Sequence, residues 1–379
     1  MKHLVVVLTL GLLVAGCSTN PRAIEPNELE RFDAEYSVER EWRSRAGRGV
    51  RKENLVLRPA VIQQQVFAGD TDGRIYAFER DSGKRLWRKT TDDRVSAGFY
   101  AGFGVVLYGT REGHAVARSI DDGSELWRTP LSSEILAMPT ASADRAFFLS
   151  QDGRLNALSL TTGEPLWQFE AQLPILRLRS QTQPQVQGNR VYLGLPGGRL
   201  LALDVRNGVP IWDQRIAEPQ GRSELDRIVD VGPNLILQAG GVFAVTFQGQ
   251  AVVADDTDGR IYWAREMSSA TPISAQQGVL FVADDTANVR ALDMRSGQTL
   301  WQQDALYGRR LTGTSVADGT VLVGDFEGYL HWLDASDGTL VARRRHDRKG
   351  FAGNPVSFDD TFYVLGNRGR LSAYRLTPR

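Results

Sequence analysis

Short runs in which apolar and polar side chains alternate recur along this chain. In the run RIYAF at residues 74–78, successive side chains point to opposite faces, as a half-buried strand requires. The run belongs to the segment VFAGDTDGRIYAFERDSGKRLW, which ends at Trp87. Segments of the same form cover residues 66–87, 106–127, 147–167, 191–212, 243–263, 279–301, 321–342 and 362–376. Repetition on this scale predicts an array of equivalent small units.

Turn residues divide each unit into strands of constant length. Asp72-Gly73 is typical of a tight hairpin, since such a turn needs positive φ, and Gly83 marks a second turn ten residues later. The same interval separates Gly113 from Gly123, Gly153 from Gly163, Gly198 from Gly208, Gly249 from Gly259 and Gly328 from Gly338. A further short strand is expected before each copy, as at residues 138–141 and 271–273. Four antiparallel strands in each of eight units predict an all-β fold, an eight-bladed β-propeller.

The last unit ends before its outermost strand, and an unmatched strand stands near the start of the chain. Residues 38–42 (VEREW) resemble residues 125–127 (ELW), but no copy of the repeat precedes them. We therefore expect this N-terminal strand to complete the eighth blade and close the ring, which hides the edges that an open sheet would expose. Seven tryptophans then occupy one equivalent position, where we expect them to pack between blades: Trp42, Trp87, Trp127, Trp167, Trp212, Trp263 and Trp301.

The first residues are typical of an export signal. A short polar start and an apolar run lead to Val14-Ala15-Gly16-Cys17, which resembles the lipobox of bacterial lipoproteins. We expect residues 1–16 to be removed as a signal peptide and Cys17, the only cysteine, to carry the lipid. Ser18 stands where an aspartate would resemble the signal for retention in the inner membrane. The lipid is therefore expected in the outer membrane, with the protein on the periplasmic face.

This interpretation divides the chain into three parts. Residues 1–16 are the signal peptide, residues 17–35 are an N-terminal lipid-anchored linker, and residues 36–379 form a single propeller domain.

Composition and motifs favour a protein without enzymatic chemistry. The 45 Lys and Arg residues balance 45 Asp and Glu residues, which gives no electrostatic footprint for nucleic acid. The histidines after position 16 lie in different blades, without the spacing that would place two of them on one metal ion. We find no nucleophile elbow, no cysteine nucleophile and no phosphate-binding loop. No catalytic residue, metal or cofactor is expected.

Two features imitate ligand sites. Residues 70–73 and 256–259 both read DTDG, like part of a calcium loop, but they fall at turns of the repeat and lack the full EF-hand ligand spacing, so hairpins are favoured. The basic run at residues 343–346 (RRRH) permits a phosphate-binding interpretation. It also falls on the outermost strand of the seventh blade, where charges deter edge-to-edge pairing, and we favour this second interpretation.

The repeat as a whole resembles a known propeller repeat. The segment that runs from Ala291-Leu292-Asp293 to Leu300-Trp301 is similar to the pyrroloquinoline-quinone repeat, which quinoprotein dehydrogenases and the BamB family share. The dehydrogenases have an adjacent cysteine pair and a set of calcium ligands that this chain lacks. Three local segments resemble BamB: GDFEGYLHW at residues 324–332, LRLRS at residues 176–180, and ELDR at residues 224–227 followed by Asp230-Val231.

The resemblance implies a non-enzymatic lipoprotein of the outer-membrane β-barrel assembly machinery. Its implied partner is BamA, bound through the periplasmic POTRA domains, and the resemblance further implies nascent outer-membrane proteins as partners. The alternative that the repeat leaves open is a periplasmic quinoprotein dehydrogenase. The family's BamA-contacting residues correspond to Leu176, Leu178, Arg179 and Asp230. Gly232 stands where the family pattern has a second aspartate, which puts that part of the contact in doubt.

The repeat spacing leads to the same region independently. The intervals from position 167 to 212 and from 212 to 263 are longer than those between positions 87, 127 and 167, so their extra residues lie in neighbouring loops. We expect Leu176, Leu178, Arg179 and Asp230 to form one patch, apolar at its centre and charged at its edge. Alternatively, the two leucines pack beneath their own loop.

Overall fold

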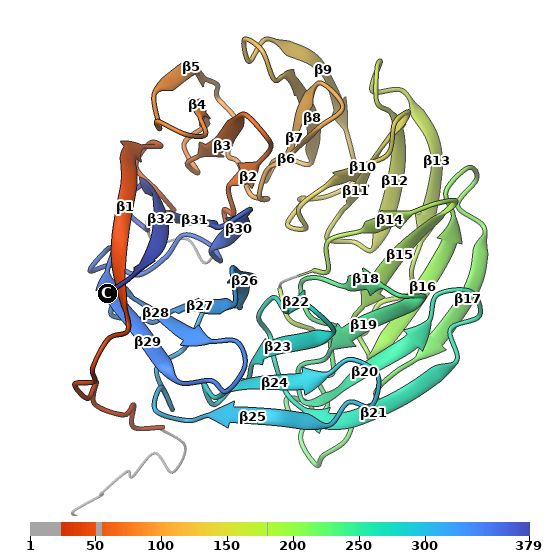
Figure 1. The fold of residues 1–379 in the computed structure, drawn as a ribbon. Coiled ribbons are helices and arrows are strands. Elements are labelled where there is room, and N and C mark those ends of the chain that lie inside the picture. The colour runs from red at the N-terminus through yellow and green to blue at the C-terminus, as the bar shows by residue number, and fades with distance from the viewer. Residues whose placement is uncertain (1–23, 51–54, 180) are drawn as a thin grey trace, which may run out of the picture.

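The computed structural model describes residues 24–50, 55–179 and 181–379. Within these residues the strands form eight four-stranded antiparallel sheets, which follow one another around a ring (Figure 1). The predicted all-β, eight-bladed propeller is thereby confirmed. The described chain contains no helix of the length and apolarity needed to cross a membrane. Residues 1–16 and Cys17 lie outside the described residues.

The chain enters each of the first seven blades at the inner strand and leaves at the outer strand (Figure 1). The first four blades are β2 (Ala60–Val61), β3 (Gln65–Gly69), β4 (Arg74–Glu79), β5 (Arg85–Thr90); β6 (Tyr100–Gly102), β7 (Val105–Gly109), β8 (His114–Ser119), β9 (Glu125–Pro130); β10 (Thr140–Ala141), β11 (Arg145–Leu149), β12 (Arg154–Ser159), β13 (Pro165–Glu170); and β14 (Gln185–Gln187), β15 (Arg190–Leu195), β16 (Arg199–Asp204), β17 (Pro210–Arg215). The next three are β18 (Ile236–Gln238), β19 (Gly241–Val245), β20 (Gly249–Asp255), β21 (Ile261–Met267); β22 (Ser274–Gln276), β23 (Val279–Ala283), β24 (Val289–Asp293), β25 (Thr299–Gln303); and β26 (Ser315–Ala317), β27 (Thr320–Gly324), β28 (Tyr329–Asp334), β29 (Leu340–Arg345).

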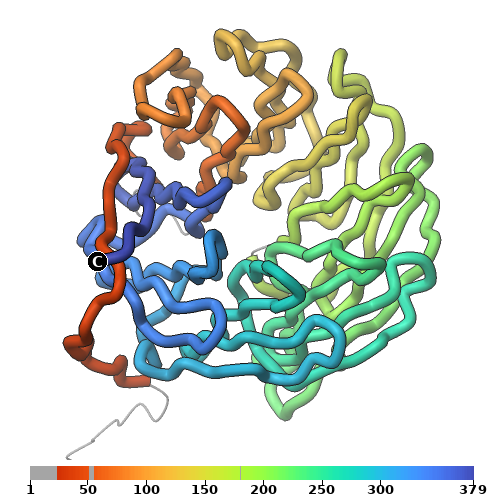
Figure 2. Tube along the Cα trace, in the orientation of Figure 1, coloured from red at the N-terminus to blue at the C-terminus, as the bar shows by residue number. Residues whose placement is uncertain are grey.

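The eighth blade joins the two ends of the chain, as predicted. Its inner strands are β30 (Val356–Phe358), β31 (Thr361–Leu365) and β32 (Arg370–Pro378), and its outer strand is β1 (Tyr36–Arg45). β1 runs antiparallel to β32 from the pair Tyr36 and Pro378 to the pair Arg45 and Arg370. Figure 2 shows the red start of the described chain beside its blue end. The ring is closed by backbone hydrogen bonds between residues more than 300 positions apart.

The inner strands are shorter than the sequence indicated. In the third blade β10 begins at Thr140, after Pro139, and in the sixth blade β22 begins at Ser274, after Pro272. The predicted strand at residues 271–273 is therefore wrong in position. Proline has no N–H to donate to a strand partner, and the carbonyl oxygen of Pro272 instead accepts a hydrogen bond from the backbone N–H of Thr314, at 3.1 Å, in the next blade.

One tryptophan and one glycine join the blades at seven of the eight junctions. Each of the seven equivalent tryptophans donates its indole N–H to a backbone carbonyl of the following blade, at 2.7 to 3.2 Å, as Trp42 does to Arg80. The indole also covers the glycine of the second turn there, and a Cβ on Gly83 would lie 2.4 Å from the Trp42 ring. The predicted packing of tryptophan between blades is confirmed. The glycine is required both for its positive φ and for this contact.

The seventh blade exchanges the positions of two residues. In the other blades the cross-strand partner of the tryptophan is alanine, as Ala77 is for Trp87, except in the fifth blade, where Val253 faces Trp263. In the seventh blade Ala342 takes the tryptophan position and its partner on β28 is Trp332. The Trp332 side chain is fully buried and lies edge-on to Phe362 and Tyr374 of the last blade. The last blade has no second turn on which an outer tryptophan would pack, because its outer strand is β1.

Candidate partner-binding surface

The two long loops lie side by side on one face of the ring. Residues 171–184 join β13 to β14, and residues 216–235 join β17 to β18. Both loops run from an outer strand to the next inner strand, so they share a face. The backbone N–H of Gln183 donates to the carbonyl of Pro233 at 2.8 Å, and the hydroxyl of Thr182 donates to the carbonyl of Gly232 at 2.7 Å. The predicted neighbourhood of these two loops is confirmed.

Asp230 fastens the first loop to the fourth blade. One carboxylate oxygen accepts the backbone N–H of Leu178 at 2.5 Å, and the other accepts the N–H of Gly197 at 3.1 Å. The side chain is only 3% exposed, and burial raises its pKa above the ordinary value. The expectation that Asp230 forms a charged edge of the patch is wrong, because its carboxylate is used to hold the loop backbone. Asp230 is a positioning residue here.

Arg179 is exposed, and its charge is directed at another carboxylate. Its guanidinium donates to both oxygens of Glu134, at 3.1 and 3.0 Å. Glu134 belongs to the connection between the second and third blades and also pairs with Arg111 at 3.3 Å. Both hydrogen bonds come from one guanidinium nitrogen, so Glu134 holds the end of the Arg179 side chain at a single point. Glu134 therefore holds the Arg179 side chain, whereas the hydrogen bonds to Asp230 come from backbone N–H groups.

The end of the first loop presents apolar side chains to solvent. Ile175 is 97% exposed and Leu176 is 44% exposed, whereas Leu178 is partly buried. Arg177 closes this turn by donating to the carbonyls of Pro174 and Gln151, at 3.1 and 3.0 Å. We call residues 174–179 the loop tip. Packing beneath the loop is thus excluded for Leu176.

Sequence reasoning missed two exposed apolar residues at this surface. Ile175 stands beside the predicted Leu176, and Leu225, 68% exposed, lies on the neighbouring loop. The carbonyl of Leu225 accepts a hydrogen bond from the side chain of Gln248 at 3.2 Å. In the sequence, both stand out as apolar residues inside a polar, lengthened loop. This pattern does not by itself show whether the side chain is exposed or buried.

Gly232 lies in a confined place. Its N–H donates to the carbonyl of Val245 at 2.8 Å, and a Cβ added at Gly232 would lie 2.9 Å from the same oxygen. An aspartate at this position would require a small shift of the backbone. Gly232 therefore offers no side chain for the contact that the family's second aspartate would make. Its backbone packs closely against the carbonyl of Val245 instead.

The GDFEGYLHW segment forms a buried network. Asp325 and His331 are fully buried, with the His331 Nε2 atom 3.0 Å from a carboxylate oxygen of Asp325. Arg309 donates to Asp325 at 2.9 Å and to the carbonyl of Asn27 at 2.8 Å. Arg343 donates to Nδ1 of His331 at 3.2 Å and to the carbonyl of Glu30 at 2.7 Å. The segment thereby orients two arginines that hold the residues preceding β1.

The three arginines of the basic run end the outermost strand of the seventh blade, β29, as expected, and His346 directly follows it. Its arginines are engaged within the chain. Arg343 lies over the ring of Phe32 and Arg345 over the ring of Tyr329, while Arg344 donates to the carbonyl of Val38. The N–H of Glu35 also donates to the carbonyl of Val341 at 3.1 Å. These contacts place residues before and within β1 along the edge of β29, and the effect of the charges on edge-to-edge pairing stays a prediction.

The DTDG segments are both hairpin turns, as favoured from the sequence. Asp70 is buried, and one of its oxygens accepts the backbone N–H groups of Asp72 and Arg74, at 3.0 Å each. Asp255 accepts the N–H of Thr257 at 2.7 Å in the second segment. No cluster of three or more His, Cys, Asp or Glu side chains suited to a metal ion occurs in the residues that the structure describes.

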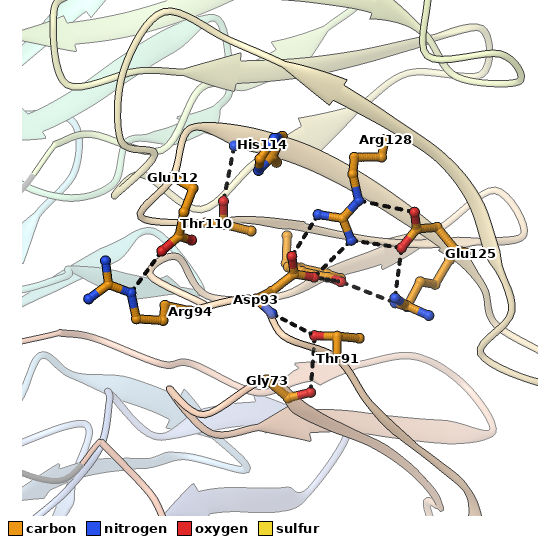
Figure 3. A network of polar contacts seen from close by, with 11 residues as sticks. Gly73, Thr91, Asp93, Arg94, Thr110, Glu112, His114, Glu125 and Arg128 are labelled. Carbon is orange, nitrogen blue, oxygen red and sulfur yellow. Dashed lines mark hydrogen bonds and ion pairs between the residues drawn. The ribbon is translucent and has the colours of Figure 1, made fainter.

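A polar network joins the first two blades (Figure 3). Arg128 donates to both oxygens of Asp93, at 2.6 and 3.0 Å, and Tyr108 donates to Asp93 at 2.9 Å. Burial opposes ionisation of Asp93, but these hydrogen bonds outweigh it and lower its pKa. Glu112 lies at the margin of the network, where it accepts a hydrogen bond from Arg94 at 2.7 Å. It provides a charged position in a short loop.

Comparison with known proteins identifies the family. The family model described as outer membrane protein assembly factor BamB matches residues 71–303 and 285–377. The outer membrane protein assembly factor BamB of Pseudomonas aeruginosa is 46% identical over 99% of both chains, and that of Escherichia coli is 30% identical over 96% of both. The chain belongs to the BamB family. The family resemblance inferred from the sequence is confirmed.

Solved structures agree on the fold. The crystal structure of BamB from Moraxella catarrhalis has a TM-score of 0.81 at 22% identity and covers 89% of this chain and 100% of that chain. A quinohemoprotein alcohol dehydrogenase from Comamonas testosteroni has a TM-score of 0.69 at 13% identity and covers 89% and 76%. At such low identity these likenesses show only the propeller, which BamB proteins share with dehydrogenases.

Proposed function

We propose that this protein is a non-enzymatic scaffold in outer-membrane protein assembly and that its loop tip binds the POTRA domains of BamA. The observation that carries the proposal is the exposed apolar pair Ile175 and Leu176, held on a loop fixed at both sides. Asp230 holds the backbone of this loop, and the pairing of Arg179 with Glu134 ties it to the third blade. Exposed apolar side chains on a fixed loop favour a protein partner that covers them.

The same proposal includes a location for the protein, at the outer membrane. Cys17, following a signal peptide at residues 1–16, would carry a lipid in the outer membrane, and residues 17–35 would link it to the propeller on the periplasmic face. The names of the relatives support the assembly role. Nascent outer-membrane proteins are the further partners that this role suggests.

Binding to purified POTRA domains tests the loop tip. We expect the double substitution Leu176→Ala with Arg179→Ala to weaken binding about tenfold or more, which is about 1.4 kcal/mol or more. The melting temperature should change little, because both side chains are exposed. Asp230→Asn should weaken binding indirectly, through the position of the loop. In this variant an amide nitrogen replaces one of the two carboxylate oxygens that accept backbone N–H groups.

Glu112→Ala is the matched control, because it removes a charge from a short loop of another blade. Unaltered affinity of the double variant would show that the loop tip is not the docking site. A large fall in its melting temperature would show that these side chains stabilise the fold. Alcohol oxidation dependent on pyrroloquinoline quinone would favour the dehydrogenase alternative over a scaffold.

A further inference from the structure

A cavity of about 220 Å³ lies at the mouth of the central channel. Loops leading into the inner strands of several blades line it, on the same face as the loop tip. Its walls are mainly apolar, with side chains that come from far apart in the sequence: Leu55, Leu136, Met138, Pro233 and Pro272. No carboxylate side chain is among the described residues that line it, whereas Arg58 and Arg179 both are.

Arg58 is firmly placed at this mouth. Its backbone carbonyl accepts the N–H of Phe99 at 3.3 Å. A glycine of each neighbouring blade lies against it: a Cβ on Gly98 would be 3.3 Å from the Arg58 backbone nitrogen, and one on Gly353 would be 3.0 Å from it. The second and eighth blades therefore hold this residue between them. Burial lowers the pKa of the Arg58 guanidinium.

The charge of Arg58 has no partner among the described residues. Arg179, the other cation at the cavity, is paired with Glu134, but no hydrogen bond or ion pair of the described chain reaches the Arg58 guanidinium. Arg58 is partly buried, and a cation that is partly withdrawn from water and lacks a partner favours a nearby anion. The cavity therefore has room for an anion and a charge that favours one.

A second polar atom in the cavity wall is also unpaired. The amide nitrogen of Gln181 donates to the carbonyl of Ser150 at 3.0 Å, while its Oε1 atom is buried and lacks a partner in the described structure. Other amides at the cavity are already engaged: Asn234 makes two hydrogen bonds with the backbone of Ile273, at 2.9 Å each. The Oε1 atom of Gln181 is thus a buried acceptor without a partner, which a ligand N–H group would reach once the side chain turns toward the cavity.

We propose that the channel mouth binds a carboxylate attached to a short apolar group, with the carboxylate on Arg58 and the apolar group against Leu136, Met138 and Pro272. Both a free aliphatic acid and the C-terminal residue of a peptide have this chemistry. Only the peptide end also offers a backbone N–H, which Gln181 would accept. This binding differs from the proposed contact with BamA, because its carboxylate lies on Arg58, whereas Arg179 stands where the loop tip and the cavity wall meet.

Calorimetric titration of the full-length protein separates the two sources. The probes are hexanoate, which has only the carboxylate and an apolar chain, and N-acetyl-leucine, which adds an N–H group. Hexanamide and N-acetyl-leucinamide are the matched probes without charge. We expect each acid to bind about tenfold or more tightly than its amide. Tighter binding of N-acetyl-leucine that Gln181→Met reduces to the level of hexanoate would identify a peptide end as the ligand.

Arg58→Gln should weaken binding of both acids about tenfold or more. The control Arg206→Gln should leave binding unchanged, because Arg206 is 71% exposed and pairs with Asp204 on a turn between β16 and β17. Equal affinity for acids and amides, or no binding of either acid at about 10 mM, which corresponds to roughly 2.7 kcal/mol, would overturn the proposal. If Arg58→Gln does not fold, the comparison of acid with amide on the unmodified protein still decides it.

Discussion

At the scale of single residues, the ring is held together by repeated contacts between one indole and one glycine. The indole supplies apolar area and one hydrogen bond, and the glycine supplies the space into which the ring fits. In the seventh blade Trp332 and Ala342 exchange these positions, so the tryptophan stands on β28 and the alanine on β29. The outer strand carries the tryptophan where the next blade has a second turn with a glycine, and the last blade has no such turn.

Trp42 should be the most informative tryptophan to remove, because it belongs to the strand that closes the ring. Its indole is 7% exposed, donates to the carbonyl of Arg80 at 2.7 Å and lies 6.0 Å from the ring of Tyr363. We expect Trp42→Ala to lower the free energy of unfolding by about 3–5 kcal/mol, measured by urea denaturation. Leu86→Ala, at an exposed position, should cost less than about 1 kcal/mol. Similar losses for both would contradict the packing described.

His346 makes the stability of the folded ring depend on pH. It is buried, its Nδ1 accepts the hydroxyl of Tyr374 at 2.9 Å and its Nε2 donates to the carbonyl of Arg370 at 3.1 Å. Burial lowers its pKa to about 4, so the unfolded chain binds the proton more readily than the folded chain. Its stabilising contribution is therefore present above the ordinary pKa of 6.5 and is lost as the pH falls towards 4.

The contribution of His346 to the free energy of unfolding changes by about 3 kcal/mol between pH 6.5 and pH 4. We expect His346→Gln to remove this part of the decline in unfolding free energy between pH 7 and pH 4, while an amide keeps one donor and one acceptor in place. Denaturation curves at several pH values measure it. An identical pH profile in the variant and the unmodified protein would show that His346 does not titrate as described.

At the scale of elements, the N-terminal strand and the residues before it act together. β1 completes the eighth blade, and the preceding residues lie along the seventh through contacts with Arg309 and Arg343. The buried pair Asp325 and His331 orients these arginines. The GDFEGYLHW segment is therefore explained in this structure by how it holds the N-terminal segment.

Two truncations distinguish the contributions of these parts. Deleting residues 17–31 removes the contacts of Asn27 and Glu30, which are few hydrogen bonds near the surface, and should cost about 1–2 kcal/mol. Deleting residues 17–43 also removes Trp42 and most of β1, so the last blade loses its outer strand. The second truncation should melt far below the first and expose strand β32 to aggregation. Equal melting temperatures would contradict closure of the ring by β1.

At the scale of the whole molecule, one face of the ring gathers the long loops, the loop tip and the channel mouth. Arg179 belongs to both the loop tip and the wall of the cavity. Loops on this face carry the variation between blades, while the strands repeat. The repeated strands thus provide a rigid support for a surface that the loops define.

Cys17→Ala tests how this molecule is anchored. If Cys17 carries the lipid, the variant should fold with an unchanged melting temperature and leave the membrane fraction, because lipid burial supplies the attachment. Fractionation and mass spectrometry of the native N-terminus are the measurements. Cys17 without a lipid in the native protein would contradict the anchor.

The sequence by itself determined the number of blades, the closing strand and the positions of the tryptophans, because strand alternation and turn residues are local and repeat at a regular interval. It also located the two long loops, since an insertion changes that interval. Only the tertiary structure decided that Asp230 is buried, that Arg179 pairs with Glu134, and that Trp332 replaces the missing tryptophan. Each of these depends on residues from different blades that meet only once the ring has closed. The exposure of a side chain and its ion pairs depend on contacts between blades, and a local pattern of residues does not predict them.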